Sequence, residues 1–211
     1  HGDCLLISVS GGQDSMGLLK LLIDLQRIHN WELYVWHGDH GWHEKSSEIA
    51  KELKLWCEKS NLNFFCDQTN IEETKTEKDA REWRYQKLFK LACLISSSSK
   101  DQKNIRVLTA HTGNDRAETL IMNLSRGSDL IGLSNLREER ILDGNIKLIR
   151  PLLEFSRDET EKICRKMNLP IWIDPSNKNL NFTRNKIRHE VLPLLESLHI
   201  GCTSRISSLA E

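Results

Sequence analysis

The sequence of 211 residues lacks the features that mark several classes of protein. No apolar run approaches the roughly 20 residues that a membrane-spanning helix requires, and the first residues do not form a basic stretch leading into an apolar signal core. Lys plus Arg and Asp plus Glu both number 30. Overall charge therefore gives no support for nucleic-acid binding, which must rest on local clusters. The 38% hydrophobic and 28% charged residues are typical of a soluble globular domain without a membrane partner.

Closely spaced cysteines are also lacking. Metal and iron–sulfur sites usually show short spacings such as Cys-x-x-Cys, so we expect neither kind of site. Several cysteines lie in apolar patterns, as buried small hydrophobic residues do, and disulfides are not expected. We predict a reducing compartment, the cytoplasm, with a plastid as the alternative. The six cysteines are Cys4, Cys57, Cys66, Cys93, Cys164 and Cys202.

Short β-rich apolar runs alternate with segments of helical periodicity. Strands are expected at 4–10, 33–36, 63–66, 106–110 and 147–150, and helices at 15–29, 46–60, 77–95, 115–124, 156–167 and about 183–198. The polar tract 96–104 is predicted to be a surface loop. This order predicts an α/β fold: a mostly parallel five-stranded sheet with helices on both faces and a small C-terminal helical extension. We expect a nucleotide-binding catalytic domain at 1–155 and a helical C-terminal part at 156–211.

The loop between the first strand and the first helix carries the strongest motif. Its glycines let the backbone approach a ligand closely, and the N–H groups at the helix start face an anion. The pattern is neither a Walker loop nor the dinucleotide fingerprint. An ordinary glycine turn is the alternative, but the strand–loop–helix context favours a pyrophosphate site, and we predict ATP binding. The loop consists of Ser10, Gly11, Gly12, Gln13, Asp14 and Ser15.

Two further motifs lie where they could reach a nucleotide. Asp39 and His40 follow the second strand, and an ordinary polar loop is the alternative explanation for them. A zinc site is not expected, because no third metal ligand is evident. Arg81, Arg84 and Tyr85 share one face of a long helix. Charge pairing at the protein surface is the usual explanation for such a face. The more specific alternative is that the guanidinium groups bind a phosphate or a base of a ligand.

Two later motifs carry charge, one acidic and one basic. Asp115 and Glu118 share a face of one helix, where they could favour the helix dipole or bind an ammonium group or a metal. A basic cluster follows near the C-terminus, which could grip an RNA backbone or pyrophosphate, although a basic surface helix is the more common explanation. Its members are Arg184, Lys186, Arg188 and His189, beside Phe182.

The loop 10–15 resembles the signature of the PP-loop ATP pyrophosphatases. The ordered set of motifs, with Arg126-Gly127-Ser128, Arg150-Pro151-Leu152-Leu153 and Asp174-Pro175-Ser176-Asn177, resembles the tRNA(Ile)-lysidine synthetases from Leu5 to about Leu195. The resemblance implies adenylation of C2 of the cytidine at the first anticodon position of isoleucine tRNA with a CAU anticodon. Free L-lysine then attacks C2 and expels AMP. The change would switch the tRNA from methionine to isoleucine identity.

The resemblance also implies roles for residues. The loop from Ser10 to Ser15 would hold the phosphates of ATP, with Mg²⁺ near Asp14 and with Asp39 and His40 beside the nucleotide. Asp115 and Glu118 would receive the lysine ammonium and help to deprotonate it. Arg81 and a guanidinium from Arg184 or Arg188 would orient the cytidine or stabilise the adenylate. The further substrate-binding residues would be Arg84, His111, Arg126, Arg184 and Asn185.

Departures from the family and rival functions qualify this prediction. Asn114 stands where the family often has an acid. Many members carry a further C-terminal tRNA-binding region, so this chain is either a fragment or a short form, and a homodimer is left open. A tRNA thiolase is the nearest rival, but no cysteine pair or sulfur-carrier domain is visible. A non-catalytic ATP- or RNA-binding module would not need the acids Asp14, Asp115 and Glu118.

Overall fold

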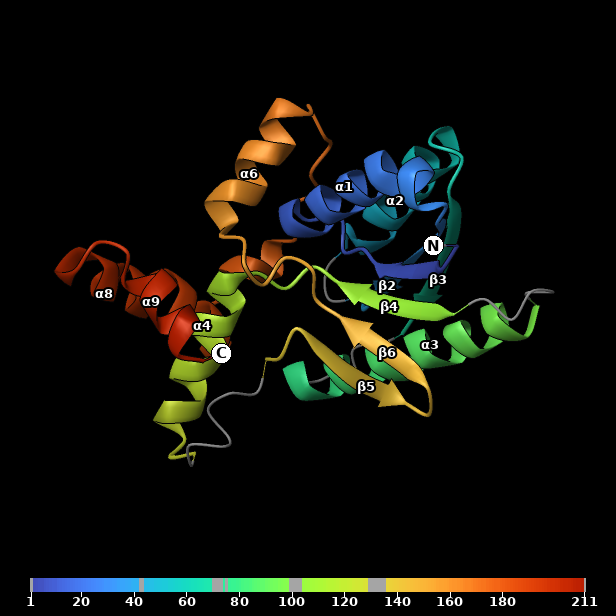
Figure 1. Ribbon diagram of the computed structural model, residues 1–211. Helices are drawn as coiled ribbons and strands as arrows, with labels where there is room; N and C mark the ends of the chain where they lie inside the picture. The colour runs from blue at the N-terminus through green and yellow to red at the C-terminus, as the bar shows by residue number, and fades with distance from the viewer. Residues whose placement is uncertain are drawn as a thin grey trace.

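One six-stranded sheet forms the centre of the protein (Figure 1). The computed structural model describes residues 2–41, 44–69, 74, 76–98, 104–128 and 136–210. The strand order is β3-β2-β1-β4-β6-β5, and all neighbours are parallel except β5, which runs antiparallel to β6. The strands are β1 Cys4–Ser8, β2 Glu32–Asp39, β3 Asn63–Gln68, β4 Ile105–Thr109, β5 Glu139–Asp143 and β6 Ile146–Ile149.

The predicted α/β fold is confirmed, but the sheet has six strands rather than five. The additional strand, β5, lies at the edge of the sheet and alternates between exposed and half-buried residues. Such a strand has no continuous apolar run, because only one of its faces packs against the protein. A turn at Gly144 connects it to β6.

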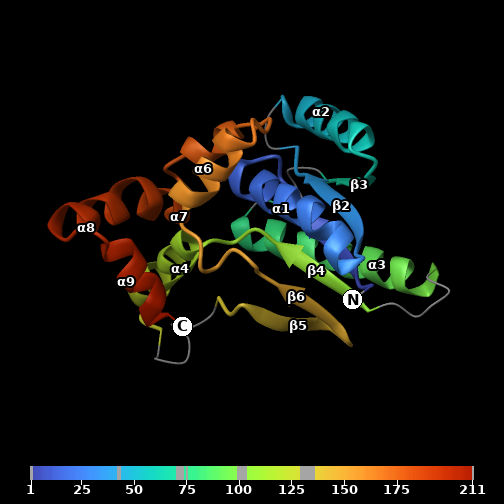
Figure 2. The same ribbon diagram turned by 45° about the horizontal axis from the view of Figure 1, so that its top comes forward.

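Helices cover both faces of the sheet. Leu5 and Ile7 of β1 pack in one hydrophobic cluster with residues of α1 (Gln13–His29) and α2 (Ser46–Lys59). Leu6 packs in a second cluster with Leu88 and Ala92 of α3 (Glu77–Ser98). Successive residues of a strand point to opposite faces, so β1 supplies both clusters. Figure 2 shows α1 and α3 on opposite sides of the strands. None of the helices in the described ranges is both long and apolar enough to cross a membrane.

Most of the remaining helices gather around α4 (Gly113–Ser125), away from the N-terminus (Figure 1), whereas α6 packs against α1. Ala117 of α4 packs against Ile187 and Leu192. The predicted helix at 183–198 contains a π-helical segment between two α-helical ones, and Pro193 lies at the start of the last of them. The elements that follow β6 in the chain are α6 Arg157–Lys166, the 3-10 helix η1 Pro175–Lys178, α7 Thr183–Lys186, the π-helix η2 Ile187–Val191, α8 Leu192–Leu198 and α9 Cys202–Leu209.

The predicted loop at 96–104 is partly wrong. Residues 96–98 belong to the last turn of α3, because Ile95 on the same turn is buried in the second cluster and holds the helix to the sheet. Asn104 precedes β4 and is exposed. Residues 99–103 lie outside the described residues.

The strand order reverses between β1 and β4, because the chain moves outward through β2 and β3 before it crosses to β4. Ligands of open α/β sheets bind beyond the carboxyl ends of the strands at such a reversal. The loop at Ser10–Ser15 follows β1, and the start of α4 follows β4. The fold therefore brings the two strongest motifs of the sequence to one place.

Substitution of Gly38 by alanine tests the packing of β2 against α3. A Cβ atom there would lie 2.5 Å from Trp36 and 2.8 Å from Trp83, so the rings would have to shift. We expect the free energy of unfolding to fall by about 1–3 kcal/mol, as for other overpacked cores. At Gly17 in α1 the nearest atom lies 3.6 Å away. Gly17→Ala should change stability by less than about 1 kcal/mol. Urea unfolding compares the two; equal stability of both variants would contradict the prediction.

Candidate functional site

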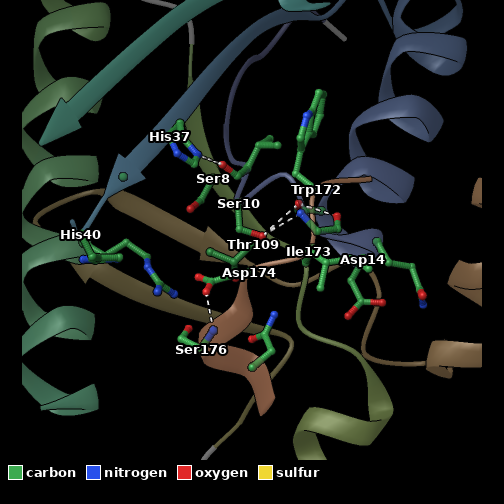
Figure 3. Close-up of a pocket in the computed structure, with 18 of the residues that line it drawn as sticks. Ser8, Ser10, Asp14, His37, His40, Thr109, Trp172, Ile173, Asp174 and Ser176 are labelled. Carbon is green, nitrogen blue, oxygen red and sulfur yellow. Dashed lines mark hydrogen bonds between the residues drawn. The ribbon is translucent and has the colours of Figure 1, made fainter. Parts of the chain in front are cut away.

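A cavity of about 580 Å³ opens at the carboxyl ends of β1, β2 and β4. This volume lies in the range of small-molecule and cofactor sites, about 300–1,000 Å³. Figure 3 shows His37 and His40 at one side of the cavity and Asp14 at the other. The segment from Trp172 to Asp174 also lines it. All of the loop residues except Gly11 face this space.

The loop has the geometry of an anion site. Gly11 has a φ of +86°, which favours glycine, and a Cβ atom there would lie 3.3 Å from the Trp172 ring. Gly12 occupies the N-cap of α1 and offers no side-chain cap, so the first N–H groups of the helix are available to a ligand. The Ser15 hydroxyl donates to the Gly12 carbonyl oxygen over 2.9 Å. The residues therefore fit a bound phosphate group.

Three carboxylates and three guanidinium groups meet beside this loop; we name them the carboxylate–arginine cluster. Glu118 of α4 is its centre, with a side chain that is 0% exposed. Arg157 donates to Glu118 over 2.7 Å, and Arg184 and Arg188 each donate over 2.8 Å. A buried carboxylate is costly unless it is paired in this way. The cluster consists of Asp14, Asp115, Glu118, Arg157, Arg184 and Arg188.

Asp115 has two functions, one for each oxygen. Its Oδ2 accepts from the backbone N–H of Thr112 over 2.8 Å and from the Thr112 hydroxyl over 2.9 Å, which forms a capping box at the start of α4. Its Oδ1 accepts from Arg157 over 2.8 Å and from Arg184 over 3.0 Å. One oxygen of Asp115 thus stabilises the start of α4, and the other oxygen is bound by the arginines.

The arginines determine the charge of the acids. Burial raises the pKa of Asp115, but Arg157 and Arg184 outweigh it and hold that pKa well below its usual range. Burial likewise raises the pKa of Glu118, and the hydrogen bond from Arg188 with the charges of Arg157 and Arg184 lowers it overall. Both carboxylates are therefore ionised at neutral pH. They can bind a cation, but a carboxylate with so low a pKa is a poor proton acceptor.

Asp14 is the exception among the three acids. Its pKa is raised, because burial outweighs the hydrogen bond from Thr160 and the charge of Arg157. Its Oδ1 accepts from the Thr160 hydroxyl, and its Oδ2 lies 3.5 Å from Arg157 Nε. The contact between Oδ2 and Arg157 is long, so Oδ2 is the oxygen that could bind a cation.

Three histidines of the cavity are uncharged at neutral pH. Burial lowers the pKa of His111 to about 3 and that of His40 to about 4, and it also lowers the pKa of His37. His37 Nδ1 lies 2.8 Å from the Val9 carbonyl oxygen, so this nitrogen carries the proton. These rings offer polar contacts to a ligand rather than positive charge.

Most of the residues predicted for the site line the cavity. Asp39, His40, Arg84, His111, Asn185 and the cluster arginines Arg184 and Arg188 are among them. Asp39 is also structural, since its Oδ1 accepts from the Gly41 N–H over 2.9 Å. Asn185 donates to the carbonyl oxygens of Ser176 and Asn179, which fixes the segment at η1.

One predicted residue, Glu118, is fully buried against the cluster arginines and does not itself line the cavity. Two others lie away from the cavity. Arg81 is exposed on α3, with its Cζ 5.6 Å from the centroid of the Tyr85 ring. Arg126 is exposed in the turn that ends α4. Neither side chain lines the cavity. Helical spacing placed Arg81 and Arg84 on a common face, but only Arg84 reaches the cavity wall.

Arg157 and Thr160 are the main residues that the site prediction omitted. They are three apart at the start of α6, and Thr160 is fully buried against Asp14. The backbone N–H of Arg157 donates to the side-chain oxygen of Asn114 over 2.9 Å. Asn114, which replaces an expected acid, thus helps to place Arg157. The sequence shows only that two polar residues lie three positions apart at the start of a helix. It does not show their contact with Asp14, because Asp14 lies more than 140 positions away in the sequence.

Fold and site together define a nucleotide-binding α/β domain with a phosphate loop at the reversal of strand order. A family model described as the PP-loop domain matches residues 1–195, and the chain belongs to this family. The match supports the use of ATP.

Relatives with recorded names give finer comparisons. The chain is 60% identical over 211 residues to a tRNA(Ile)-lysidine synthase of Prochlorococcus marinus, covering 100% of this chain and 63% of the relative. It is 39% identical to a chloroplastic tRNA(Ile)-lysidine synthase of Pyropia yezoensis, covering 93% of this chain and 57% of the relative. The chain thus spans less than two thirds of the length of these proteins.

Solved structures share the fold at low sequence identity. A U34-tRNA thiolase from Methanococcus maripaludis, with a [4Fe-4S] cluster, matches with a TM-score of 0.68 at 18% identity, over 99% of this chain and 70% of that one. An NMN synthetase from Francisella tularensis matches with a TM-score of 0.53 at 11% identity, over 99% of this chain and 84% of that one. These likenesses concern the fold alone.

Replacement of Arg157 by methionine tests the cluster. The change removes one of three cations from buried carboxylates, so we expect a loss of about 3 kcal/mol in the free energy of unfolding. Arg165→Met on the same helix is the matched control, because the Arg165 side chain is 79% exposed; it should cost less than about 0.5 kcal/mol. Chemical denaturation measures both. A cost for Arg157→Met no greater than for the control would show that the cluster is not stabilising.

The lowered pKa values predict how stability depends on pH. A carboxyl group whose pKa is lower in the folded state stabilises the protein above its unfolded pKa, and this contribution is lost as pH falls through the folded pKa. The free energy of unfolding should therefore fall as pH is lowered from about 5 to 3, owing to Asp115 and Glu118. The raised pKa of Asp14 opposes this trend. Urea titrations of Asp115→Asn should show a weaker pH dependence, and exposed Asp158→Asn should retain it; identical profiles would refute the assignment.

Proposed function

We propose that the chain is the catalytic part of an enzyme that uses ATP to join free lysine to C2 of the first anticodon cytidine of isoleucine tRNA with a CAU anticodon. The product is lysidine, formed through an adenylated tRNA. One observation carries this proposal: the carboxylate–arginine cluster adjoins the phosphate loop, and all of its members except the buried Glu118 line the same cavity as the loop. The 60% identity to a protein named tRNA(Ile)-lysidine synthase supports it.

The first half of the reaction needs a place for ATP. The loop and the N-terminus of α1 would hold its phosphates, with Asp39 and His40 at the nucleotide side of the cavity. Adenylation converts the cytidine oxygen into a phosphate ester, which is a much better leaving group. Catalysis of such a transfer depends mainly on positioning and on neutralisation of charge. Arg157, Arg184 and Arg188, which line the same cavity as the loop, would supply this positive charge.

Asp14 would hold Mg²⁺ together with the phosphates. Mg²⁺ in nucleotide sites is usually bound by one or two carboxylates and by phosphate oxygens. The long contact between Asp14 Oδ2 and Arg157 leaves that oxygen for a metal. The ion would supply further neutralisation of the departing pyrophosphate.

The second half needs a place for lysine. Asp115 and Glu118 are buried and ionised, and we assign them to binding and orientation of the lysine ammonium. Proton removal does not suit them, because their lowered pKa values make them weak bases. The cluster is neutral as it stands, with three acids facing three arginines. Phosphate groups bound at the loop would attract the guanidinium groups. The carboxylates would then be available to bind the incoming amine.

A thiolase with the same fold is the alternative. The solved U34-tRNA thiolase has a [4Fe-4S] cluster. In this chain none of the six cysteines forms a disulfide, and Cys4, Cys57 and Cys164 are buried. Among the residues that the structure describes, no three His, Cys, Asp or Glu side chains are grouped to hold a metal ion. These observations favour lysine transfer, whereas the compartment and a homodimer stay predictions.

Transfer of radiolabelled lysine to the tRNA tests the proposal, with pyrophosphate release as the measure of the first half. Wild-type protein should incorporate lysine, and Asp115→Asn should reduce incorporation by about 100-fold because orientation of the amine is lost. Its release of pyrophosphate should fall much less. Asn keeps an acceptor for the Thr112 cap, and exposed Asp158→Asn is the matched control. Incorporation of sulfur in place of lysine, or full lysine transfer by Asp115→Asn, would contradict the proposal.

A further inference from the structure

A second group of arginines lies outside the cavity, around Tyr85 of α3. Arg140 of β5 places its Cζ 4.6 Å from the centroid of the Tyr85 ring, and Arg81 places its Cζ 5.6 Å from it. Both distances are within the range of cation–π contacts. We name Arg81, Arg140 and Arg150, together with Tyr85, the arginine flank.

Arg150 lies at the base of the flank and is 1% exposed. Its Nη1 donates to the Arg137 carbonyl oxygen. By strict geometry its Nε and Nη2 and the Nε of Arg140 have no hydrogen-bond partner within the described residues, although the Arg150 guanidinium lies close enough to Tyr85 to interact with its hydroxyl. Buried donors without a partner are rare and costly. They mark a place where an anion or water would be favourable.

The flank differs in charge from the carboxylate–arginine cluster. In that cluster the acids raise the pKa of Arg157 and Arg184 despite burial. In the flank, burial lowers the pKa of Arg150, Tyr85 opposes that shift, and the charges of Arg140 and Arg81 add smaller lowering effects. The acidic residue nearest in the sequence to Arg140, Glu139, is paired with Lys147 over 2.6 Å. Among the described residues, Arg81 and Arg140 thus contact an aromatic ring, whereas the arginines of the cluster contact carboxylates.

The flank continues from the cavity. Arg84 lines the cavity wall, and Arg81 and Tyr85 are its neighbours on the same helix, at spacings of three and one. Arginine side chains thus continue from Arg84 at the cavity wall to Arg81 and Arg140 around Tyr85. The sequence as a whole has no net charge, so this group of arginines is a local feature.

We propose that the arginine flank binds phosphodiester groups of the RNA strand that enters the cavity. The inference rests on the proposed function, because it takes the substrate to be an RNA. Guanidinium groups match phosphate oxygens in geometry as well as in charge, and a strand that places one nucleotide in the cavity must run across the adjoining surface. Arg81 is exposed and Arg140 is half-buried, so both keep surface for contact. Arg150, being buried, positions Tyr85 and adds to the positive potential.

The test is RNA affinity as a function of salt. Arg140→Gln, in the complete protein, should weaken binding of the isoleucine tRNA about tenfold and reduce the slope of log K against log salt by about 1. Arg140→Lys should keep the slope. Arg165→Gln removes the same charge from α6 and is the matched control. The affinity for ATP should be unchanged in all three variants.

The outcomes separate this inference from the proposed function. If Arg140→Gln and Arg165→Gln bind RNA equally well at every salt concentration, the flank does not contact phosphate, even where lysine transfer proceeds. If wild-type protein binds the tRNA but transfers no lysine, the proposed function fails and the flank is still judged by the salt slope. A loss of binding to an acidic polyglutamate peptide, with RNA affinity unchanged, would assign the flank to a protein partner and overturn the proposal.

Discussion

The burial of Glu118 is the constraint on which the site depends. A carboxylate that is 0% exposed must be compensated, and it is bound by guanidinium groups from α6, α7 and η2. These elements follow Glu118 by 39 to 70 positions in the sequence, so one buried charge fixes the C-terminal helices against the sheet domain. Removal of a partner from such a group costs more than the group itself contributes. Substitution of any single member of the cluster should therefore destabilise the protein.

The two arginine groups show that composition alone says little about charge in this protein. Equal numbers of acids and bases give no net charge, yet the bases are unevenly compensated. Three of them meet three acids beside the phosphate loop, and those around Tyr85 meet an aromatic ring and a backbone carbonyl. A compensated group stabilises the fold, whereas an uncompensated one raises the local potential and suits a polyanion.

The sequence predicted those features whose cause is local. The loop at Ser10–Ser15 follows from glycines between a buried strand and a helix, and the shared face of Asp115 and Glu118 follows from helical spacing. Strand β5 was missed because an exposed edge imposes no apolar run. Arg157 was missed because its function depends on packing of α6 against α1, where Gln13 donates to its carbonyl oxygen over 2.7 Å. No local sequence pattern could show that contact, or the hydrogen bond that the Arg157 N–H donates to the Asn114 side chain.

The balance of charges in the cluster bears on how the proposed reaction would proceed. Three acids and three bases in contact leave no attraction for a further ammonium group, unless one guanidinium moves. Phosphate groups at the loop would compete for those same guanidinium groups, and Arg157 already bridges Asp14 on the loop side and Glu118 on the other. A bound nucleotide would thus turn Asp115 and Glu118 from satisfied partners into an open cation site. On this reasoning the amine binds well only after the phosphates, which protects the acids from occupation by lysine before activation.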